Sequence, residues 1–515
     1  MRGHVTETMT ETLDELLAPH PEGPALIVGG RTSSRRELAE RAAAAAWGLR
    51  ELGFRRGDAL ALWLPNSAEW LALFFAAARL GLLVVPVSTR YRSFEVRHLL
   101  GTSKAKGIVI APGFLDIDFG AILGSIRAEL PELAHVIEVD AGGGFGNLPQ
   151  AGRIGPEERG RPRDPLCTFS TSGTTGNPKL AVHDQASIAK HARLVAQDFE
   201  MAAGDAVLCA LPLYGAFGFC QALGALAGAA ACVLETAFDA ARAAAAIEAH
   251  KVTHFIGTDG MLEGVLRVQA RDLSSWRHGG FADFLGRARQ LVEEAEARIG
   301  LRLVGLYGSS ECFALMAKQR EAAAIEERAR SGGIPISGEI EFRVVDALSG
   351  TALPEGEPGE LQVKGYNVTS GYLRNPEATA AAFTADGWFR TGDLAYRSGT
   401  GFVFLSRIKD SLRLRGYLVD PSEIEEYLLR HAAVEVAQVV GVNRPGEGDV
   451  AVAFVRLGAA GASEAELVAY CRDGMASYKV PRRIAIVEDF PVVHGPNGTK
   501  IQKAKLREQA QALIA

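Results

Sequence analysis

The chain has 515 residues, of which 48% are hydrophobic and 23% are charged, and its formal net charge at pH 7 is −6. These fractions are typical of globular proteins and exclude a largely disordered chain. The length is sufficient for roughly two to four domain cores that fold without metals or disulfides. The negative net charge provides no electrostatic footprint for duplex nucleic acid. Any anionic ligand must therefore be bound by a local site.

The cysteines and the N-terminal segment indicate the compartment. The six cysteines are widely spaced without a C-x-x-C pair, which argues against a disulfide framework and a structural zinc site. The acidic N-terminal segment lacks the apolar run of a signal peptide. These features predict a cytoplasmic protein. The uncharged stretch 206–234 is long enough for a membrane span, but Pro212, Gln221 and four glycines favour strand, loop, buried helix and strand instead.

The first half of the chain alternates helical and strand patterns. Ser34 and Glu37 form a capping box, and the apolar spacing that follows predicts a helix that stops at Gly53. A second helix is predicted over 67–81, between short buried strands at 58–66 and 82–87. Such alternation is typical of a parallel sheet covered by helices on both faces.

The pattern changes twice after about Gly338. The segments EIEFRVVD and ELQVKG alternate with period two and are separated by turn residues, which predicts antiparallel strands. After Arg407, a helix is predicted to begin at Asp420 and Pro421, followed by two strands and a second capped helix at Ser463. The expected fold is a large α/β N-terminal domain, with helix-covered sheets and a small antiparallel β subdomain, and a small mobile α+β C-terminal domain.

The segment STSGTTGNPK, from Ser170 to Lys179, carries the strongest chemical signal. Seven of its ten residues are Gly, Ser or Thr, so its backbone N–H groups and hydroxyls suit phosphate oxygens, and Lys179 adds a positive charge. The spacing differs from that of a Walker P-loop, and a glycine-rich segment can also be an ordinary loop. A second cluster, GGGFG at 142–146, lacks the third glycine of a dinucleotide site and is expected to be a surface turn.

Five motifs in order resemble the adenylate-forming superfamily of acyl- and aryl-CoA ligases, carrier-protein adenylation domains and luciferases. They are STSGTTGNPK, LYGSSE (306–311), GWFRTGD (387–393), SRIKDSLRLRGYLVDPSEIE (406–425) and GTKIQKAKLRE with Lys500. The resemblance extends from about Ser33 to Glu508 and is greatest to an acyl-CoA ligase. It implies that a carboxylic acid is joined to AMP, at the expense of ATP with Mg²⁺, and that the acyl group then passes to a thiol.

The resemblance also implies roles for individual residues. Tyr307 would lie on the adenine, Ser310 would reach the α-phosphate, and Asp393 would accept hydrogen bonds from both ribose hydroxyls. Glu311 would be a catalytic residue that binds Mg²⁺, a hard cation that prefers oxygen ligands. The residues expected to bind the nucleotide are Thr171, Ser172, Gly173, Thr174, Thr175, Gly176, Lys179, Tyr307, Ser310, Asp393 and Arg407. Considered alone, Glu311 could cap a helix, Asp393 could close a turn and Arg407 could pair with a carboxylate.

Lys500 is expected to be the catalyst of adenylation. An ammonium at the bridging oxygen offsets the repulsion between the attacking carboxylate and the α-phosphate. Considered alone, Lys500 could also be a solvated lysine in a basic tail. The family's domain alternation implies a nucleotide- and acyl-binding domain over 1–405, a hinge at 406–409 centred on Lys409, and a mobile domain over 410–515 that brings Gly416 to coenzyme A.

Three positions depart from the family pattern. Gly215 stands where the family usually has histidine or another large side chain, and Thr499 stands where a glycine usually precedes the lysine. Phe281, in HGGFADF, would lie beside the adenine or the acyl group. Together with Tyr214 and Phe217, Gly215 and Phe281 predict an apolar acyl pocket for a bulky or aromatic monocarboxylic acid, although these aromatics could equally belong to the core.

The leading hypothesis is a complete acid–CoA ligase that uses ATP, Mg²⁺ and coenzyme A. Three alternatives remain. The chain could be a thioesterification-only enzyme supplied with acyl-AMP by another enzyme, a stand-alone adenylation domain that loads a carrier protein, or a non-catalytic adenylate-binding protein. No nucleic-acid partner is expected, and the sequence defines neither the acid nor the oligomeric state.

Overall fold

The structure is a computed structural model of the chain, and the residues it describes are 12–140, 143–145, 148, 152, 155, 159–171, 178–283, 288–347, 349–408, 412–415, 417–419, 421–444, 447–495 and 498–514. The chain forms two compact units. The first unit contains residues 1–89, 100–170 and 180–408, and the second contains residues 90–99, 171–179 and 409–515.

A sheet of six described strands in the first unit has the order β6-β5-β3-β4-β7-β8. Strand β3 pairs in parallel with β4 and β5, β5 pairs in parallel with β6, and β4 pairs in parallel with β7. The predicted parallel sheet is therefore confirmed. The strands are β3 (Ala59–Trp63), β4 (Leu83–Pro86), β5 (Gly107–Ile110), β6 (His135–Glu138), β7 (Pro165–Thr171) and β8 (Lys179–Asp184).

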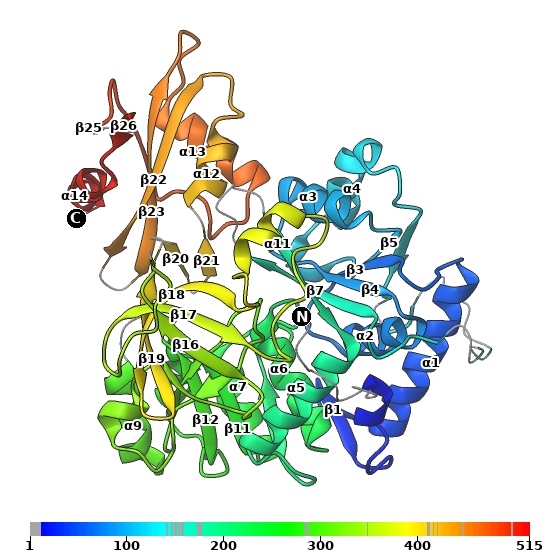
Figure 1. The fold of residues 1–515 in the computed structure, drawn as a ribbon. Helices are drawn as coiled ribbons and strands as arrows, with labels where there is room; N and C mark the ends of the chain where they lie inside the picture. The colour runs from blue at the N-terminus through cyan, green and yellow to red at the C-terminus, as the bar shows by residue number, and fades with distance from the viewer. Residues whose placement is uncertain are drawn as a thin grey trace. The chain divides into compact units, whose positions relative to one another are not determined.

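Two predicted helices, α1 (Arg35–Glu51) and α2 (Ala68–Leu80), pack beside one another (Figure 1). The hydroxyl of Ser34 caps α1 by accepting the backbone N–H of Glu37 at 3.1 Å, and the Glu37 carboxylate accepts the N–H of Ser34. Helix α2 ends at Gly81, whose φ of 66° is the left-handed conformation that glycine adopts readily. The predicted capping box is confirmed.

The first unit also contains a sheet of 13 described strands, in the order β16-β17-β18-β19-β15-β14-β13-β12-β11-β9-β10-β1-β2. The pairs from β13 to β1 are parallel, whereas those from β16 to β13 are antiparallel. The predicted antiparallel β subdomain is confirmed. The strands are β1 (Pro24–Val28), β2 (Arg31–Ser34), β9 (Ala206–Cys209), β10 (Ala231–Leu234), β11 (His254–Thr258), β12 (His278–Ala282), β13 (Val304–Tyr307), β14 (Ala317–Lys318), β15 (Gly332–Pro335), β16 (Glu341–Val345), β17 (Gly359–Lys364), β18 (Phe389–Ser398) and β19 (Gly401–Arg407).

The buried helix predicted within the uncharged stretch is present as α6, between β9 and β10. It is one of the remaining helices before residue 409. The uncharged stretch 206–234 is β9, a loop, helix α6 and β10, and ten of the twelve residues of α6 are buried. These helices are η1 (Leu13–Leu16), α3 (Ser93–Ser103), η2 (Phe114–Asp116), α4 (Phe119–Ile126), η3 (Arg127–Glu129), α5 (Gln185–Asp198), α6 (Ala216–Ala227), α7 (Ala240–His250), α8 (Asp259–Leu266), α9 (Ala288–Ile299), α10 (Ile325–Arg328) and α11 (Pro376–Ala382).

The second unit has a sheet in the order β21-β20-β23-β22, with β24 paired to β23, and a separate hairpin of β25 and β26. Helices α12 and α13 lie on one side of this sheet and α14 on the other (Figure 1). The α+β fold predicted for the C-terminal part is confirmed. The elements are β20 (Leu412–Leu414), β21 (Tyr417–Val419), α12 (Pro421–Leu428), β22 (Val434–Arg444), β23 (Gly448–Leu457), α13 (Glu464–Gly474), β24 (Arg483–Ile486), β25 (Val492–Gly495), β26 (Gly498–Ile501) and α14 (Lys503–Ile514).

The second unit contains a buried ionic cluster. The Lys479 ammonium lies 2.7 Å from Glu423 Oε2 and 3.9 Å from Glu95 Oε1, and all three residues are buried. Burial alone would lower the pKa of Lys479, but the nearby Glu423 carboxylate, the Tyr91 phenol and the Glu95 carboxylate outweigh it and raise the pKa. Lys479 therefore remains charged.

Three sequence expectations concern disulfides, a metal site and a membrane span. All six cysteines are free and buried. Within the described part of the chain, no group of three or more His, Cys, Asp or Glu side chains is arranged to hold a metal ion. None of the helices described has both the length and the apolar character needed to cross a membrane.

Candidate active site

Tyr307 is the last residue of β13, and its hydroxyl donates a hydrogen bond to Asp393 Oδ2 at 2.6 Å. Asp393 lies in β18, 86 positions further along the chain. The Tyr307 ring packs against Phe402 and Phe404 at centroid distances of 5.0 and 5.8 Å. The structure thus brings together an aromatic ring and a carboxylate that the sequence assigned to the adenine and to the ribose.

The loop 308–316 follows Tyr307 directly and carries Glu311. Gly308 approaches the loop backbone closely, because a Cβ at this position would lie 2.6 Å from the carbonyl oxygen of Phe313. Phe313 and Leu315 adopt left-handed conformations with φ of 59° and 62°. For residues other than glycine such conformations cost about 1–3 kcal/mol each and concentrate at functional sites. Surrounding contacts must therefore hold this loop in place.

Two buried histidines hold one side of the loop. His183 Nε2 donates to the carbonyl oxygen of Ser310, and His191 Nε2 donates to that of Ala314, each at 2.8 Å. Both imidazoles stack on the Phe313 ring, at centroid distances of 3.9 and 4.8 Å. Burial lowers the pKa of each histidine to about 4. Both rings are therefore neutral at pH 7 and hold the loop without adding charge.

The segment before α11 holds the other side of the loop. Asn367 Nδ2 donates to the carbonyl oxygen of Cys312 at 2.7 Å. The backbone N–H of Thr369 donates to the carbonyl oxygen of Glu311 at 2.6 Å. The hydroxyl of Tyr372 donates to Glu311 Oε1 at 3.1 Å. No helix in the described part of the chain begins at Glu311, so its carboxylate is a side-chain acceptor at a loop and does not cap a helix.

The residues predicted for the acyl pocket lie at or after the carboxyl ends of parallel strands of the same sheet, where ligands bind in open α/β sheets. Tyr214, Gly215 and Phe217 follow β9 and are half-buried. A Cβ at Gly215 would meet only Pro212 O, at 3.6 Å, so the backbone does not require glycine there. Phe281, near the end of β12, is fully buried in an aliphatic and aromatic core. Its place in the acyl pocket stays a prediction.

The phosphate-binding motif is described only at its ends. Thr171 is the last residue of β7 and Lys179 is the first residue of β8, and both are half-buried. The predicted nucleotide-binding, hinge and thiol-site residues that lie outside the described residues are Ser172, Gly173, Thr174, Thr175, Gly176, Lys409 and Gly416.

The structure describes the backbone of the two remaining predicted residues. Arg407 ends β19 and pairs with Asp393 in the ladder between β18 and β19. Lys500 lies in β26, next to Thr499, which pairs with His494. Because Thr499 is in an extended strand, where β-branched residues are favourable, a threonine in place of the family's glycine does not strain this backbone.

Sequence reasoning missed His183, His191 and Tyr372. His183 is next to Asp184 and His191 is next to Lys190, so neither short segment marks the histidine as a buried hydrogen-bond donor or indicates its partner. Tyr372 precedes the Asn375–Pro376 pair that begins α11, a recognisable helix start. Neither signal indicates a contact with a loop that is more than 60 positions away in the sequence.

The comparison with protein families defines the class. The profile of the AMP-binding enzyme family matches residues 13–373, and that of the AMP-binding enzyme C-terminal domain matches residues 423–494. The chain therefore belongs to the AMP-binding enzyme family, and the resemblance deduced from its motifs is confirmed.

Curated relatives share nearly the full length of the chain. The mitochondrial medium-chain acyl-CoA ligase ACSF2 of Rattus norvegicus is 30% identical over 98% of this chain and 88% of its own length. The 3-[(3aS,4S,7aS)-7a-methyl-1,5-dioxo-octahydro-1H-inden-4-yl]propanoyl:CoA ligase of Mycobacterium tuberculosis is 33% identical over 97% of this chain and 98% of its own length.

Solved structures share the fold. The o-succinylbenzoate CoA synthetase MenE of Bacillus subtilis, a double mutant bound to a product analogue, has a TM-score of 0.84 and 26% identity, covering 96% of this chain and 98% of its own. The amide bond synthetase McbA of Marinactinospora thermotolerans has a TM-score of 0.81 and 25% identity, covering 97% and 99%. The predicted fold and the assignment to the AMP-forming ligases are confirmed.

Proposed function

We propose that the chain is an acid–CoA ligase that converts a bulky, apolar carboxylic acid to its acyl-CoA thioester through an acyl-AMP intermediate. The observation that carries the proposal is the Tyr307–Asp393 hydrogen bond, formed directly beside the tightly held loop of Glu311. An aromatic ring with an adjacent carboxylate suits a nucleoside, and the loop suits its phosphates. The full-length similarity to two named CoA ligases supports this assignment.

The nucleotide-binding roles follow the family motifs. Thr171 to Lys179 would bind the phosphates of ATP, Asp393 would accept the ribose hydroxyls with Arg407 assisting, and Ser310 would reach the α-phosphate. The half-buried Glu311 carboxylate suits Mg²⁺, because a hard cation prefers oxygen ligands. Bound there, Mg²⁺ would neutralise phosphate charge as pyrophosphate leaves.

The C-terminal residues would act in both steps. Lys500 would stabilise the charge that develops as the carboxylate attacks the α-phosphate. The proposed domains are 1–405 and 410–515, with a hinge at 406–409 centred on Lys409 that would allow the region of Gly416 to meet the thiol of coenzyme A. The cytoplasmic location also remains a prediction.

The acid is proposed to be bulky because of the space around Gly215. Tyr214 and Phe217, which flank Gly215 in the sequence, are half-buried. The backbone at position 215 has room for a Cβ, so the glycine leaves space that a larger side chain would occupy. The relative from Mycobacterium tuberculosis is named for a bicyclic propanoyl substrate. An aromatic or alicyclic monocarboxylic acid is therefore the proposed substrate class.

A panel of acids tests the proposed function. Pyrophosphate release and CoA consumption are measured with straight-chain, aromatic and alicyclic monocarboxylic acids, each with ATP and Mg²⁺. Both signals should depend on the acid and be largest for the bulky members. Pyrophosphate release without CoA consumption would indicate a carrier-loading adenylation domain. CoA consumption only from synthetic acyl-AMP would indicate a transfer-only enzyme.

The variant Gly215→Phe tests the acyl pocket directly. Filling the space should lower kcat/KM for bulky acids by about 10-fold or more, while short acids change little, since pocket filling discriminates by roughly 10–200-fold. Gly124→Phe serves as the control, because Gly124 is exposed in α4 with no atom within 4 Å of an added Cβ. Equal losses for bulky and short acids would refute the pocket assignment.

A further inference from the structure

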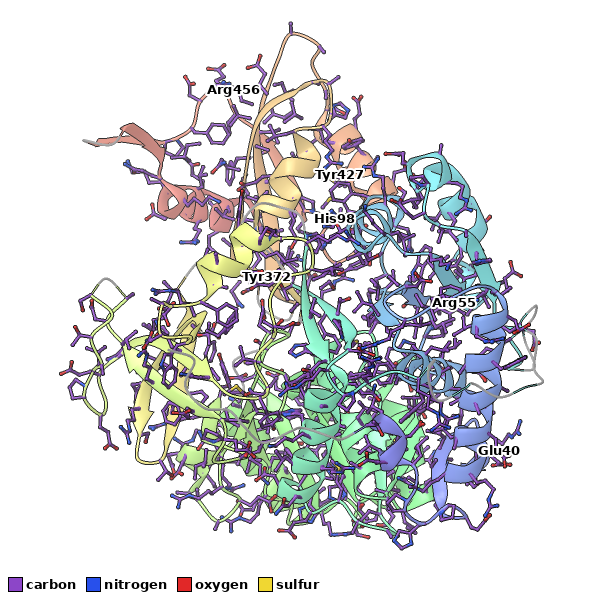
Figure 2. The ribbon with its side chains drawn as sticks, turned by 45° about the vertical axis from the view of Figure 1, so that its right-hand side comes forward. Glu40, Arg55, His98, Tyr372, Tyr427 and Arg456 are labelled. Carbon is purple, nitrogen blue, oxygen red and sulfur yellow. The ribbon has the colours of Figure 1, made fainter. Side chains whose placement is uncertain are left out.

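Tyr372, labelled in Figure 2, contacts the carboxylate proposed to bind Mg²⁺. Its hydroxyl lies 3.1 Å from Glu311 Oε1, across a sequence separation of 61 residues. An ionised carboxylate can only accept hydrogen bonds, so the phenol donates. Tyr372 lies between the motifs that assigned the nucleotide site and belongs to none of them.

The backbone of Tyr372 is fixed on both sides. Its N–H donates to Thr379 Oγ1, in helix α11, at 2.9 Å. The carbonyl oxygen of Gly371 accepts the N–H of Val182 at 3.0 Å, and the N–H of Leu373 donates to a carbonyl oxygen of β8 at 2.8 Å. The phenol is therefore presented from a backbone that is anchored to both a strand and a helix.

The same segment also holds the backbone of Glu311. The N–H of Thr369 donates to the carbonyl oxygen of Glu311 at 2.6 Å, and Asn367 Nδ2 donates to that of Cys312 at 2.7 Å. With the main chain held in this way, the remaining freedom of Glu311 is in its side-chain torsions. Ordering a glutamate side chain costs conformational entropy, and the hydrogen bond from Tyr372 restricts the Glu311 side chain before any ligand binds.

The two carboxylate oxygens of Glu311 are thereby distinguished. Oε1 accepts the Tyr372 hydroxyl, whereas among the described residues none forms a hydrogen bond or an ion pair with Oε2. An oxygen with this environment fits a hard divalent cation. Hydrogen bonds to a metal ligand orient it and tune its basicity.

We propose that Tyr372 is a positioning residue that orients the Glu311 carboxylate so that Oε2 faces the Mg²⁺ that accompanies ATP. The proposal rests on the proposed function, which places the metal at Glu311. Tyr372 acts through Glu311 and need not touch the nucleotide.

The test measures metal affinity in Tyr372→Phe. Mn²⁺ is titrated into the enzyme bound to a non-hydrolysable ATP analogue and followed by electron paramagnetic resonance. Removing the hydroxyl should raise the Kd for Mn²⁺ by about 10-fold, the lower end of the effect for partners of metal ligands. Steady-state kinetics should show a higher Mg²⁺ requirement with kcat restored at saturating Mg²⁺, which a merely misfolded variant would not show.

Two further variants make the result interpretable. Tyr396→Phe removes a hydroxyl that contacts Arg330 at 3.1 Å in an exposed part of β18, so its Kd for Mn²⁺ should equal that of the wild type. Glu311→Gln should weaken Mn²⁺ binding at least as much as Tyr372→Phe does. Unchanged affinity in Tyr372→Phe together with weakened affinity in Glu311→Gln would overturn the positioning role alone. Unchanged affinity in Glu311→Gln would instead refute the metal site of the proposed function, and the proposal with it.

Discussion

The loop of Glu311 and the hairpin of Lys500 have opposite structural support. The loop is held by His183 and His191 on one side and by the segment containing Tyr372 on the other, all through buried or half-buried contacts. The hairpin of β25 and β26 is a two-stranded sheet that pairs with no other strand the structure describes. An isolated two-stranded hairpin has little stability of its own. The comparison indicates a firmly held loop at the site proposed for the nucleotide, and a separately supported hairpin that carries the lysine proposed as the catalyst.

The support for the hairpin comes from its neighbours in the second unit. Helix α14, which begins at Lys503, buries Leu506 and Ala510 against Val440 of β22 and Phe454 of β23. The same unit contains the buried ionic cluster of Lys479. The second unit therefore contains a buried ion cluster, whereas hydrogen bonds from neutral donors hold the Glu311 loop.

The largest effect is expected at the hairpin. Lys500→Ala should lower acyl-AMP formation by about two to four decades, because an ammonium about 4 Å from the reacting anions contributes roughly 4 kcal/mol at an effective dielectric of about 20. Thioester formation from synthetic acyl-AMP should be spared. Separate assays of the two half-reactions check this, and equal losses in both would remove Lys500 from the first step.

The next largest effect concerns the stability of the second unit. Lys479→Met leaves the carboxylates of Glu423 and Glu95 buried without their cation, and breaking a buried pair in this way costs about 3–5 kcal/mol. Urea unfolding measures the loss. The control is Lys104→Met, whose exposed pair with Glu132 at 3.9 Å should change stability by less than about 1 kcal/mol. Similar losses in both variants would argue against a structural role for the buried cluster.

A smaller loss is expected when the Glu311 loop loses a histidine. In His183→Leu the carbonyl oxygen of Ser310 loses its hydrogen-bond donor, which costs about 1–3 kcal/mol for a buried group. ATP binding should weaken as the loop relaxes. In His183→Gln an amide N–H can replace the donor, so both stability and ATP affinity should lie between those of the leucine variant and the wild type. ATP affinity is measured by calorimetric titration. Equal affinities for the wild type, His183→Leu and His183→Gln would show that nucleotide binding does not depend on this hydrogen bond to the loop.

At pH 7 the titration of the buried histidines causes no change in stability, and its effect develops only as the pH falls. His183, His191 and His254 each have a folded-state pKa of about 4, below the ordinary value of 6.5, because burial disfavours the charged ring. Between these values only the unfolded state binds the protons. The free energy of unfolding should therefore be insensitive to these groups above pH 6.5 and fall toward pH 4, by up to about 1.4 kcal/mol per pH unit for each histidine.

The variant His191→Gln isolates one contribution to this slope. Glutamine can donate to the carbonyl oxygen of Ala314 but cannot be protonated, so the decline in stability between pH 6.5 and 5 should be less steep than in the wild type. Urea unfolding at several pH values provides the comparison. Parallel curves for the two proteins would show that His191 already takes up a proton in the folded state.

Local signals in the sequence predicted most of the fold. The capping box at Ser34 and the stop at Gly81 depend on residues within a few positions, and the structure confirms both helices. The period-two strands after Gly338 likewise follow from local alternation, and β16 and β17 pair as expected. The pairing order of the 13 strands could not be predicted in this way, since it depends on which distant strands meet.

The site was predictable only in part, for a related reason. Motifs identified Tyr307, Glu311 and Asp393 because their chemistry is tied to their sequence neighbours. The contacts that position them depend on tertiary structure: Tyr372 reaches Glu311 only because residues 369–373 bond to β8. His183 reaches Ser310 across 127 positions of sequence. No local pattern encodes either contact.

The most direct measurement of the proposed activity is a single-turnover experiment on the wild-type enzyme. A radiolabelled acid chosen from the panel is mixed with ATP and Mg²⁺, and samples are withdrawn and quenched at intervals. Coenzyme A is then added to the remaining, unquenched reaction. The account predicts that acyl-AMP accumulates, with one pyrophosphate released for each acyl-AMP formed. The acyl-AMP should then convert to acyl-CoA once the thiol is added. Thioester formation from synthetic acyl-AMP, with no pyrophosphate released from any acid, would contradict it.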